Sequence, residues 1–355
     1  MESGILQHTD RMWSRLSITA VLLSACCVSV SASSLFDDDT VLDISLSGPL
    51  GTISKQRQDD DRIEHPFVLG VAGMDIPVMV RVRGQSRTQL CAFPPLRLRF
   101  HDPKTEETPF LGQSKLKLVT HCRNDKEHFE NNLLDEYSAY RIFNLISDAS
   151  YRVRLLRITY YDTDGRHKDL DRPYYGFVIE SDGELAARLG GSVAKIPGVA
   201  YSRLNEQQTA RINVFQYLIA NADWSMVTAT GKEECCHNVD FVETDSELYP
   251  VPYDFDLAGI VNASYAKPPP GIRARSVKTR VYRGYCLSPI DAVAAALDEV
   301  VQLRDEIVSL TAAVPALGRA DAAERAEFVD DLLAEATNDP EKLIKKFDRD
   351  CIGKR

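Results

Sequence analysis

The chain has 355 residues, of which 44% are hydrophobic and 26% are charged, and its formal net charge is −10. This is the composition of an ordinary globular protein, long enough for one large two-lobed domain or two small ones. Because nucleic-acid binding needs a basic surface, the acidic balance argues against a nucleic-acid partner.

Residues 1–32 have the pattern of a cleavable signal peptide. Arg11 and Arg15 precede an uncharged, mostly apolar run, and Val30-Ser31-Ala32 closes it where a signal peptidase would cut. The run is shorter than the roughly 20 apolar residues that span a bilayer, and no later stretch is longer. A buried core helix is the alternative. We expect an exported protein, periplasmic or secreted, with no transmembrane helix in the mature chain.

The cysteines fit the same expectation. Leu23-Ser24-Ala25-Cys26 resembles a bacterial lipoprotein cleavage box, so a lipid anchor at Cys26 is the alternative to a freely released product. Six cysteines follow the signal, and an even number in an exported chain suggests disulfides. Zinc is the rival explanation, but no CxxC or HxxxH spacing supports it. Of the pairings that remain open, we favour Cys91 with Cys122 and Cys286 with Cys351.

The first half of the chain reads as strands with one helix. Alternating apolar and basic residues at 78–83, 96–100 and 115–119 predict half-buried strands of an antiparallel sheet. Residues 126–146 follow with a helical stripe of large apolar side chains, and Glu136 lies in the middle of that stripe. A lone carboxylate there would be costly to bury, so Glu136 needs a cation from another element.

Two more strands are expected at 154–160 and 175–180, then a helix at 206–222, a hairpin within 239–255, and helices from 289 onward. The order predicts an α+β fold in which a small strand-rich lobe, residues 33–180, precedes a larger, mainly helical lobe, residues 181–355. The segment between Glu180 and Leu204 is the expected hinge.

Four groups carry candidate chemistry. Lys117 on a strand could face Glu136, either as a structural ion pair or to hold nucleotide phosphates. Asp223 follows a helix in Asn221-Ala222-Asp223-Trp224, a place where an aspartate is often only a cap or turn residue.

The third group is His237-Asn238, whose amide oxygen suits magnesium. The fourth is Asp254-Phe255-Asp256. On an extended segment Asp254 and Asp256 would project to one face, and two such carboxylates repel unless a cation lies between them. We therefore predict a metal role for this pair, against the alternative of a solvated loop.

The order of these parts is that of phosphoryl transfer by kinases: a lysine on the phosphates, an aspartate near the acceptor hydroxyl, then an asparagine and an aspartate on magnesium. With these residues in place, the chain resembles the spore-coat-H (CotH) kinase-like family, an outlying branch of the protein kinases. The motifs that carry the resemblance lie within residues 75–262: Val82-Arg83-Gly84-Gln85-Ser86, Leu116-Lys117-Leu118, Leu134-Asp135-Glu136, Tyr175-Gly176, Asn221-Ala222-Asp223-Trp224, His237-Asn238 and Pro252-Tyr253-Asp254-Phe255-Asp256.

The resemblance implies a two-lobed, protein-kinase-like fold and a site for Mg²⁺ and ATP. Lys117 would bind the nucleotide phosphates with Glu136 orienting it, and Asp223 would be the catalytic base. Asn238 and Asp254 would hold magnesium, assisted by Asp256. The partner would be a protein substrate.

The chain departs from ordinary kinases in three ways. Asn221-Ala222-Asp223 replaces the His-Arg-Asp tripeptide of that family. The chain also lacks the glycine-rich phosphate loop, for which Arg83 or Arg87 would substitute, and 14 residues separate Asp223 from Asn238 where kinases have four. The function expected first is Mg-ATP-dependent phosphoryl or nucleotidyl transfer to a protein. The alternative is a non-catalytic, pseudokinase-like binding module of the cell envelope. A metal-dependent hydrolase using Asp254 and Asp256 is a third interpretation, but it lacks a histidine-rich ligand set.

Overall fold

The structure is a computed structural model that describes residue 1 and residues 35–353, apart from 60, 102–104, 106–107, 168, 197, 228–235 and 316–317. The predicted signal peptide, with Cys26, and Cys235 lie outside the described residues. Within them, no helix combines the length and apolar character needed to cross a membrane.

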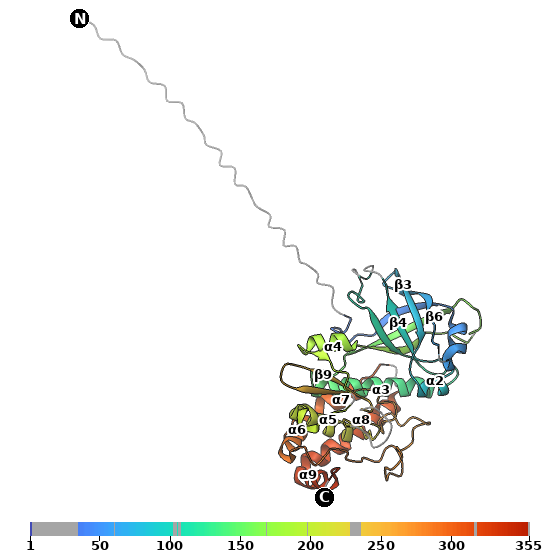
Figure 1. Cartoon of the computed structure of the whole chain (residues 1–355). Helices are drawn as coiled ribbons and strands as arrows, with labels where there is room; N and C mark the ends of the chain where they lie inside the picture. Colours follow the sequence, from blue (N-terminus) through green and yellow to red (C-terminus); the bar gives the residue numbers. More distant parts are fainter. Residues whose placement is uncertain are drawn as a thin grey trace. The chain divides into compact units, whose positions relative to one another are not determined.

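Seven of the described strands close into a barrel (Figure 1). In chain order they are β1 (Leu42–Gly48), β2 (His65–Val71), β3 (Met74–Val82), β4 (Leu96–Phe100), β5 (Lys115–Val119), β6 (Val153–Asp162) and β7 (Tyr174–Ile179). Around the barrel the order is β1-β2-β3-β4-β5-β7-β6, and β1 closes the ring by pairing in parallel with β6.

Side chains fill the barrel interior because alternate residues of each strand point inward. In β3, Ile76, Val78, Val80 and Val82 are buried, while the residues between them face outward. The interior of the barrel is therefore a packed hydrophobic core.

The predicted two-lobed, protein-kinase-like fold with a small antiparallel sheet is wrong. The sheet is a closed mixed barrel, and a separate small sheet has the order β10-β9-β8. Alternation showed which side chains of each strand face inward, but it carries no information about which strands pair. The pairing of Leu42 with Leu156 that closes the barrel joins distant parts of the chain.

The second sheet consists of β8 (Ser192–Val193), β9 (Val239–Glu243) and β10 (Leu248–Pro252). The helices lie mostly toward the C-terminus. The described helices are α1 (Leu50–Lys55), α2 (Ser86–Leu90), α3 (Glu127–Ile146), α4 (Asp182–Arg188), α5 (Glu206–Leu218), α6 (Ile290–Gln302), α7 (Arg304–Ala312), α8 (Arg319–Asn338) and α9 (Pro340–Asp350), with short 3₁₀ turns η1 (Gln56–Gln58) and η3 (Tyr201–Arg203).

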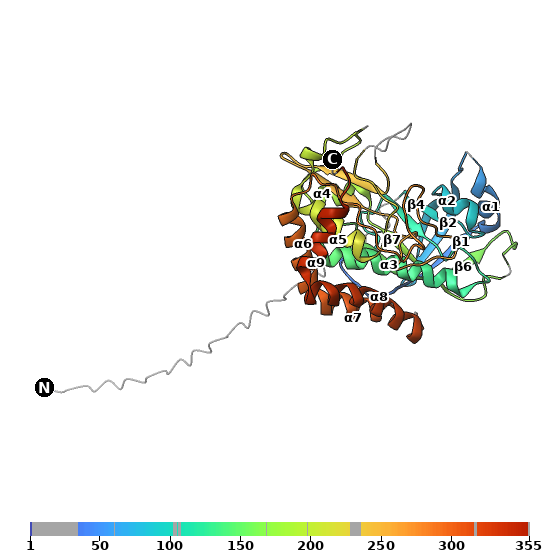
Figure 2. The same cartoon turned by 90° about the horizontal axis from the view of Figure 1, so that it is seen from below.

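Helix α3 connects the barrel to the C-terminal helices. Its apolar stripe packs in one core with Phe177 and Ile179 on the outside of β7 and with Phe215 of α5. In both Figure 1 and Figure 2, α7 and α8 lie alongside α3. Arg325 of α8 is 2.8 Å from Asp135 of α3, so α3 is held from the barrel side and from the helical side.

Both favoured disulfides are confirmed, Cys91–Cys122 and Cys286–Cys351. The first joins the residue after α2 to the segment after β5. The second joins the loop before α6 to the end of α9. Each closes a loop of several tens of residues, and cross-links of this kind stabilise a folded chain by about 2–4 kcal/mol.

Candidate functional site

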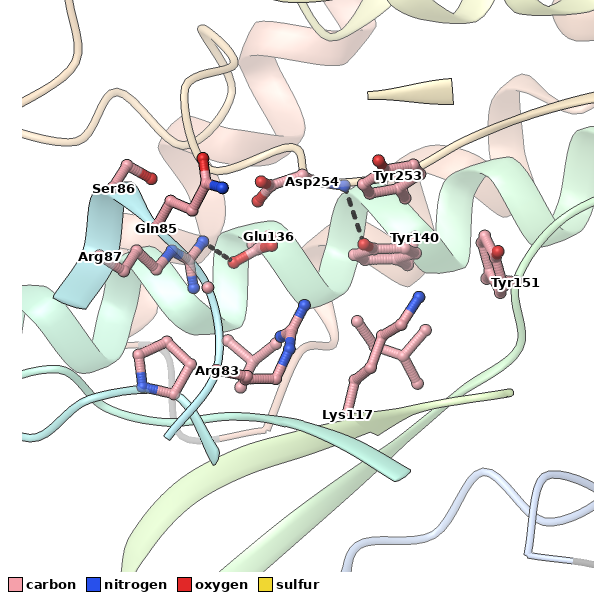
Figure 3. Close-up of a pocket in the computed structure, with 14 residues that line it drawn as sticks. Arg83, Gln85, Ser86, Arg87, Lys117, Glu136, Tyr140, Tyr151, Tyr253 and Asp254 are labelled. Atoms are coloured by element: carbon pink, nitrogen blue, oxygen red, sulfur yellow. Dashed lines mark hydrogen bonds and ion pairs between the residues drawn. The ribbon is translucent and has the colours of Figure 1, made fainter. Parts of the chain in front are cut away.

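A polar pocket lies between the outside of the barrel, helix α3 and the segment after β10 (Figure 3). The barrel contributes Lys117 of β5 and Arg83 just after β3, and both side chains rise into the pocket from the sheet. Helix α3 contributes Glu136 and Tyr140, and Asp254 enters from the opposite side. Three of the six predicted site residues, Lys117, Glu136 and Asp254, therefore line one pocket.

Lys117 and Glu136 do not form the predicted ion pair with each other. The Nζ atom of Lys117 lies 2.8 Å from Oδ1 of Asp182, at the start of α4. The rings of Tyr151 and Tyr253 lie 5.2 and 5.7 Å from the same nitrogen. Lys117 is thus positioned by one carboxylate and two aromatic faces.

Glu136 is bound by Arg87 instead, so its expected cation comes from α2. Arg87 also places its Nε 3.0 Å from Oδ2 of Asp256, which in turn accepts a hydrogen bond from Tyr265. Burial raises the pKa of Glu136 to about 7 although Arg87 opposes this. Burial by itself would lower the pKa of Arg87, but Asp256 and Glu136 hold it well above its usual range. The result is a buried Glu136–Arg87–Asp256 network, of which Glu136 and Arg87 line the pocket.

Arg83 has no hydrogen-bond or ion-pair partner for its guanidinium among the residues that the structure describes. Burial lowers the pKa of Arg83, and the Asp254 carboxylate is the main charge that opposes this. Of the two arginines expected to replace a phosphate loop, Arg87 is committed to carboxylates and Arg83 remains available to an anion.

The carboxylates of Asp254 and Asp256 have different surroundings, and the backbone at Asp254 is not extended. Asp254 has φ +60°, and its N–H donates to Tyr140 Oη at 2.9 Å. Asp256 is directed to Arg87, whereas the Asp254 carboxylate faces the pocket without a partner among the described residues. Burial, followed by the charge of Asp256, raises the pKa of Asp254 to about 6. The prediction of an extended segment here is wrong, since Asp254 adopts the left-handed conformation.

Asp223 and Asn238 are in contact with each other. Asn238 Nδ2 donates to the Asp223 carbonyl at 2.8 Å and to its Oδ2 at 3.1 Å, and His237 Nε2 lies 3.0 Å from Oδ1. Asn238 also has a positive φ, 54°, and its carbonyl accepts from Tyr253 N–H at 3.0 Å. The charge of Asp223 contributes to the raised pKa of Asp254. Asp223, Asn238 and Asp254 therefore form one neighbourhood.

Asp182 and Tyr151 help to organise the site and were not predicted from the sequence. Tyr253 and His237 were named, but their contacts with Lys117 and Asp223 were not predicted. Asp182 lies in a predicted hinge segment, and its acidic neighbour Glu184 completes a capping box with Ser181. That capping signal was readable in the sequence. The contact between Asp182 and Lys117 could not be predicted from the sequence, because it depends on how β5 and β7 pair.

Within the described part of the chain, no three or more histidine, cysteine, aspartate or glutamate side chains are grouped so as to hold a metal. Magnesium is commonly bound by one or two protein oxygens completed by substrate phosphates rather than by a full protein cage. The Asp254 carboxylate, which has no partner among the described residues, fits this incomplete type of site.

No protein-family model matches the chain, and no curated protein matches it in sequence. The likeness to the CotH family thus depends on the short motifs and their order.

Proposed function

We propose that the protein transfers a phosphoryl group from Mg-ATP to a hydroxyl of a protein substrate. The supporting observation is the charge arrangement of the pocket. Arg83 and Lys117 rise from the barrel, and Asp254, whose carboxylate has no partner among the described residues, lines the opposite side of the pocket. Such a pocket offers cations to phosphate oxygens on one side and a carboxylate to a divalent cation on the other.

Lys117 and Arg83 would bind the phosphates. Lys117 is held by Asp182, so little side-chain freedom remains to be lost on binding. Arg83 presents a planar guanidinium that can bind phosphate with two parallel hydrogen bonds. Glu136 is a positioning residue in this proposal, because it fixes Arg87 and through it Asp256.

Asp254 and Asn238 would hold Mg²⁺, which when bound supplies positive charge to the phosphate oxygens during transfer. Asp256 serves mainly to orient the segment, since its Oδ2 already accepts from Arg87 and Tyr265. Burial, and after it the charge of Asp256, raises the pKa of Asp254, and a bound cation would favour its ionised form.

Asp223 would accept the proton of the acceptor hydroxyl as that oxygen bonds to the terminal phosphorus. The bridging oxygen leaves with the electron pair of the broken P–O bond. His237 and Asn238 keep the Asp223 carboxylate in place. For nucleotidyl transfer the attack would fall on the α-phosphorus, and pyrophosphate would leave.

We place this activity outside the cytoplasm, in the periplasm or secreted, with a lipid anchor at Cys26 as an open alternative. The two disulfides are consistent with an oxidising compartment.

A non-catalytic binding module is the second candidate. It is favoured by the pairing of Lys117 with Asp182 and of Glu136 with Arg87, because both residues expected to orient a nucleotide already have partners. Such a protein would bind Mg²⁺ and an anion without transferring phosphate.

Labelling with ATP distinguishes the two. We expect γ-labelled ATP with MgCl₂ to label the protein or an added acceptor, and Asp223→Asn and Asp254→Asn to abolish the label. Asp245→Asn, at an exposed turn between β9 and β10, is the matched control. Label from α-labelled ATP would indicate nucleotidyl transfer. Equal label in wild type and both site variants would contradict the site, and Mg-dependent ATP binding without label would favour the binding module.

A further inference from the structure

A row of positive charge crosses the outside of the barrel and ends at the pocket. In the sheet register Arg81 of β3 pairs with Arg97 of β4, and Arg97 pairs with Lys117 of β5. One row further from the pocket, Arg99 pairs with Lys115. The basic face is defined by these five residues together with Arg83 at the pocket.

The basic face lowers the stability of the barrel. Like charges directly opposite on neighbouring strands destabilise a sheet, and this face contains three such pairs on a chain of net charge −10. Burial, with the charge of Arg97 next, lowers the pKa of Arg81. Like-charge pairs that destabilise the sheet and are grouped on one face indicate a functional role for that face.

Few acidic groups compensate this charge. Glu64 binds Arg99, and Asp182 binds Lys117. Among the described residues, no carboxylate forms an ion pair with Arg81, Arg83, Arg97 or Lys115. Four cations of one surface are thus available to a single anionic ligand.

The shape of the face limits the kind of anion. The barrel is closed, so β3, β4 and β5 have no free edge on which a peptide backbone could pair. Met79 is the one apolar side chain among the outward residues of the two rows, so a nucleobase would find little to stack on along them. The rings of Tyr151 and Tyr253 lie beside Lys117, where the face ends at the pocket. Neighbouring strands lie about 4.8 Å apart, so the cations follow each other closely along roughly 10 Å. The ligand that fits closely spaced cations, and that needs neither base stacking nor backbone pairing, is a phosphate chain.

We infer that the basic face binds a linear phosphate chain longer than a triphosphate, with its terminal phosphate between Arg83, Lys117 and Asp254. The inference rests on the proposed function and adds a second phosphoryl donor, a linear polyphosphate, to ATP at the same site. The acceptor oxygen bonds to the terminal phosphorus while the proton passes to Asp223. The P–O bond to the bridging oxygen breaks, and the chain leaves one phosphate shorter with that electron pair.

Calorimetry on the disulfide-intact protein tests this without requiring turnover. The probes are long-chain linear polyphosphate, tripolyphosphate and poly-L-glutamate. We expect the long chain to bind more tightly than tripolyphosphate, and the double variant Arg81→Gln/Arg97→Gln to lose about tenfold in affinity for the long chain. The slope of log affinity against log salt should fall in magnitude by about 1.4 for the two lost cations.

The matched control is Lys342→Gln/Lys345→Gln, which removes the same charge from exposed positions of α9. It should leave the affinity for polyphosphate unchanged. Equal binding of long and short chains, an unaffected Arg81→Gln/Arg97→Gln variant, or poly-L-glutamate bound as tightly as polyphosphate would each overturn the inference. None of these outcomes changes the expected labelling by ATP or its loss in Asp254→Asn. The inference and the proposed function can therefore fail separately.

Discussion

Glu136 of helix α3 forms its ion pair with Arg87 of helix α2, not with Lys117 of the neighbouring strand. The pair is nearly enclosed, since the side chains are 2% and 13% exposed. The Lys117–Asp182 pair is more open, with side chains 21% and 46% exposed. The two ion pairs therefore have different roles, one structural and one at the ligand surface.

We predict that Arg87→Met destabilises the protein far more than Lys117→Met. Loss of Arg87 leaves Glu136 and Asp256 as buried carboxylates without a cation, which costs about 3–5 kcal/mol. Loss of Lys117 breaks a partly exposed pair worth about 1 kcal/mol or less. Urea unfolding at neutral pH measures both. A Lys117→Met variant less stable than Arg87→Met would show that the two pairs have been assigned the wrong way round.

The raised pKa of Asp254 predicts a pH-dependent cost to stability. The unfolded chain loses this proton near its ordinary value of 3.8 and the folded chain near about 6. In that window the folded state holds more protons, so this carboxylate makes the free energy of unfolding fall as the pH rises. Asp254→Asn should be more stable than wild type at pH 8, and the difference should vanish below pH 4. A variant less stable than wild type at pH 8 would argue that the carboxylate has a stabilising partner.

The Cys91–Cys122 disulfide should matter for binding as well as for stability. It joins the end of α2, just beyond Arg83 and Arg87, to the segment after β5, which carries Lys117. We expect Cys91→Ala/Cys122→Ala to lose about 4 kcal/mol of stability and also to weaken anion binding, because Arg83 and Lys117 lose their fixed spacing.

The natural control for that variant is Cys286→Ala/Cys351→Ala. Its loop is longer, so a similar loss of about 4 kcal/mol is expected, but it lies at the C-terminal helices. Calorimetry with tripolyphosphate should show weaker binding in the first variant alone. Equal affinities in the two variants would mean that the first disulfide does not position the pocket.

Arg97→Gln should stabilise the protein. Arg97 is opposite Arg81 on one strand and Lys117 on the other, and the substitution relieves both repulsions. We expect a gain of about 0.5–1 kcal/mol in the free energy of unfolding, measured by urea at low salt, where charge repulsion is least screened. No gain, or a loss, would indicate that Arg97 is compensated in the folded chain.

The sequence predicted local structure well and long-range pairing poorly. Residues 126–146 were expected as one helix, and α3 covers Glu127–Ile146. The strands at 96–100 and 115–119 also match β4 and β5, because alternation is a local signal. The parallel pairing of β1 with β6 had no such signal. The apolar repeat after residue 289 likewise conceals a break at Leu303 between α6 and α7.

In the candidate site, too, local features could be predicted from the sequence and long-range contacts could not. Lys117, Glu136 and Asp254, three of the six predicted site residues, line one pocket. Their partners did not follow from the sequence, because Arg87 and Asp182 lie on the short helices α2 and α4, whose positions depend on the whole fold. The turn at Asp254 also escaped prediction, since its flanking apolar residues are typical of a strand.

Calorimetric titration of the protein with ATP, with MgCl₂ and with EDTA, tests the central claim most directly. The proposed site predicts binding that depends on magnesium and is weakened by Asp254→Asn and by Arg83→Met, with Asp245→Asn unchanged. Absence of binding at millimolar ATP, or binding equally tight in EDTA and in Asp254→Asn, would contradict it.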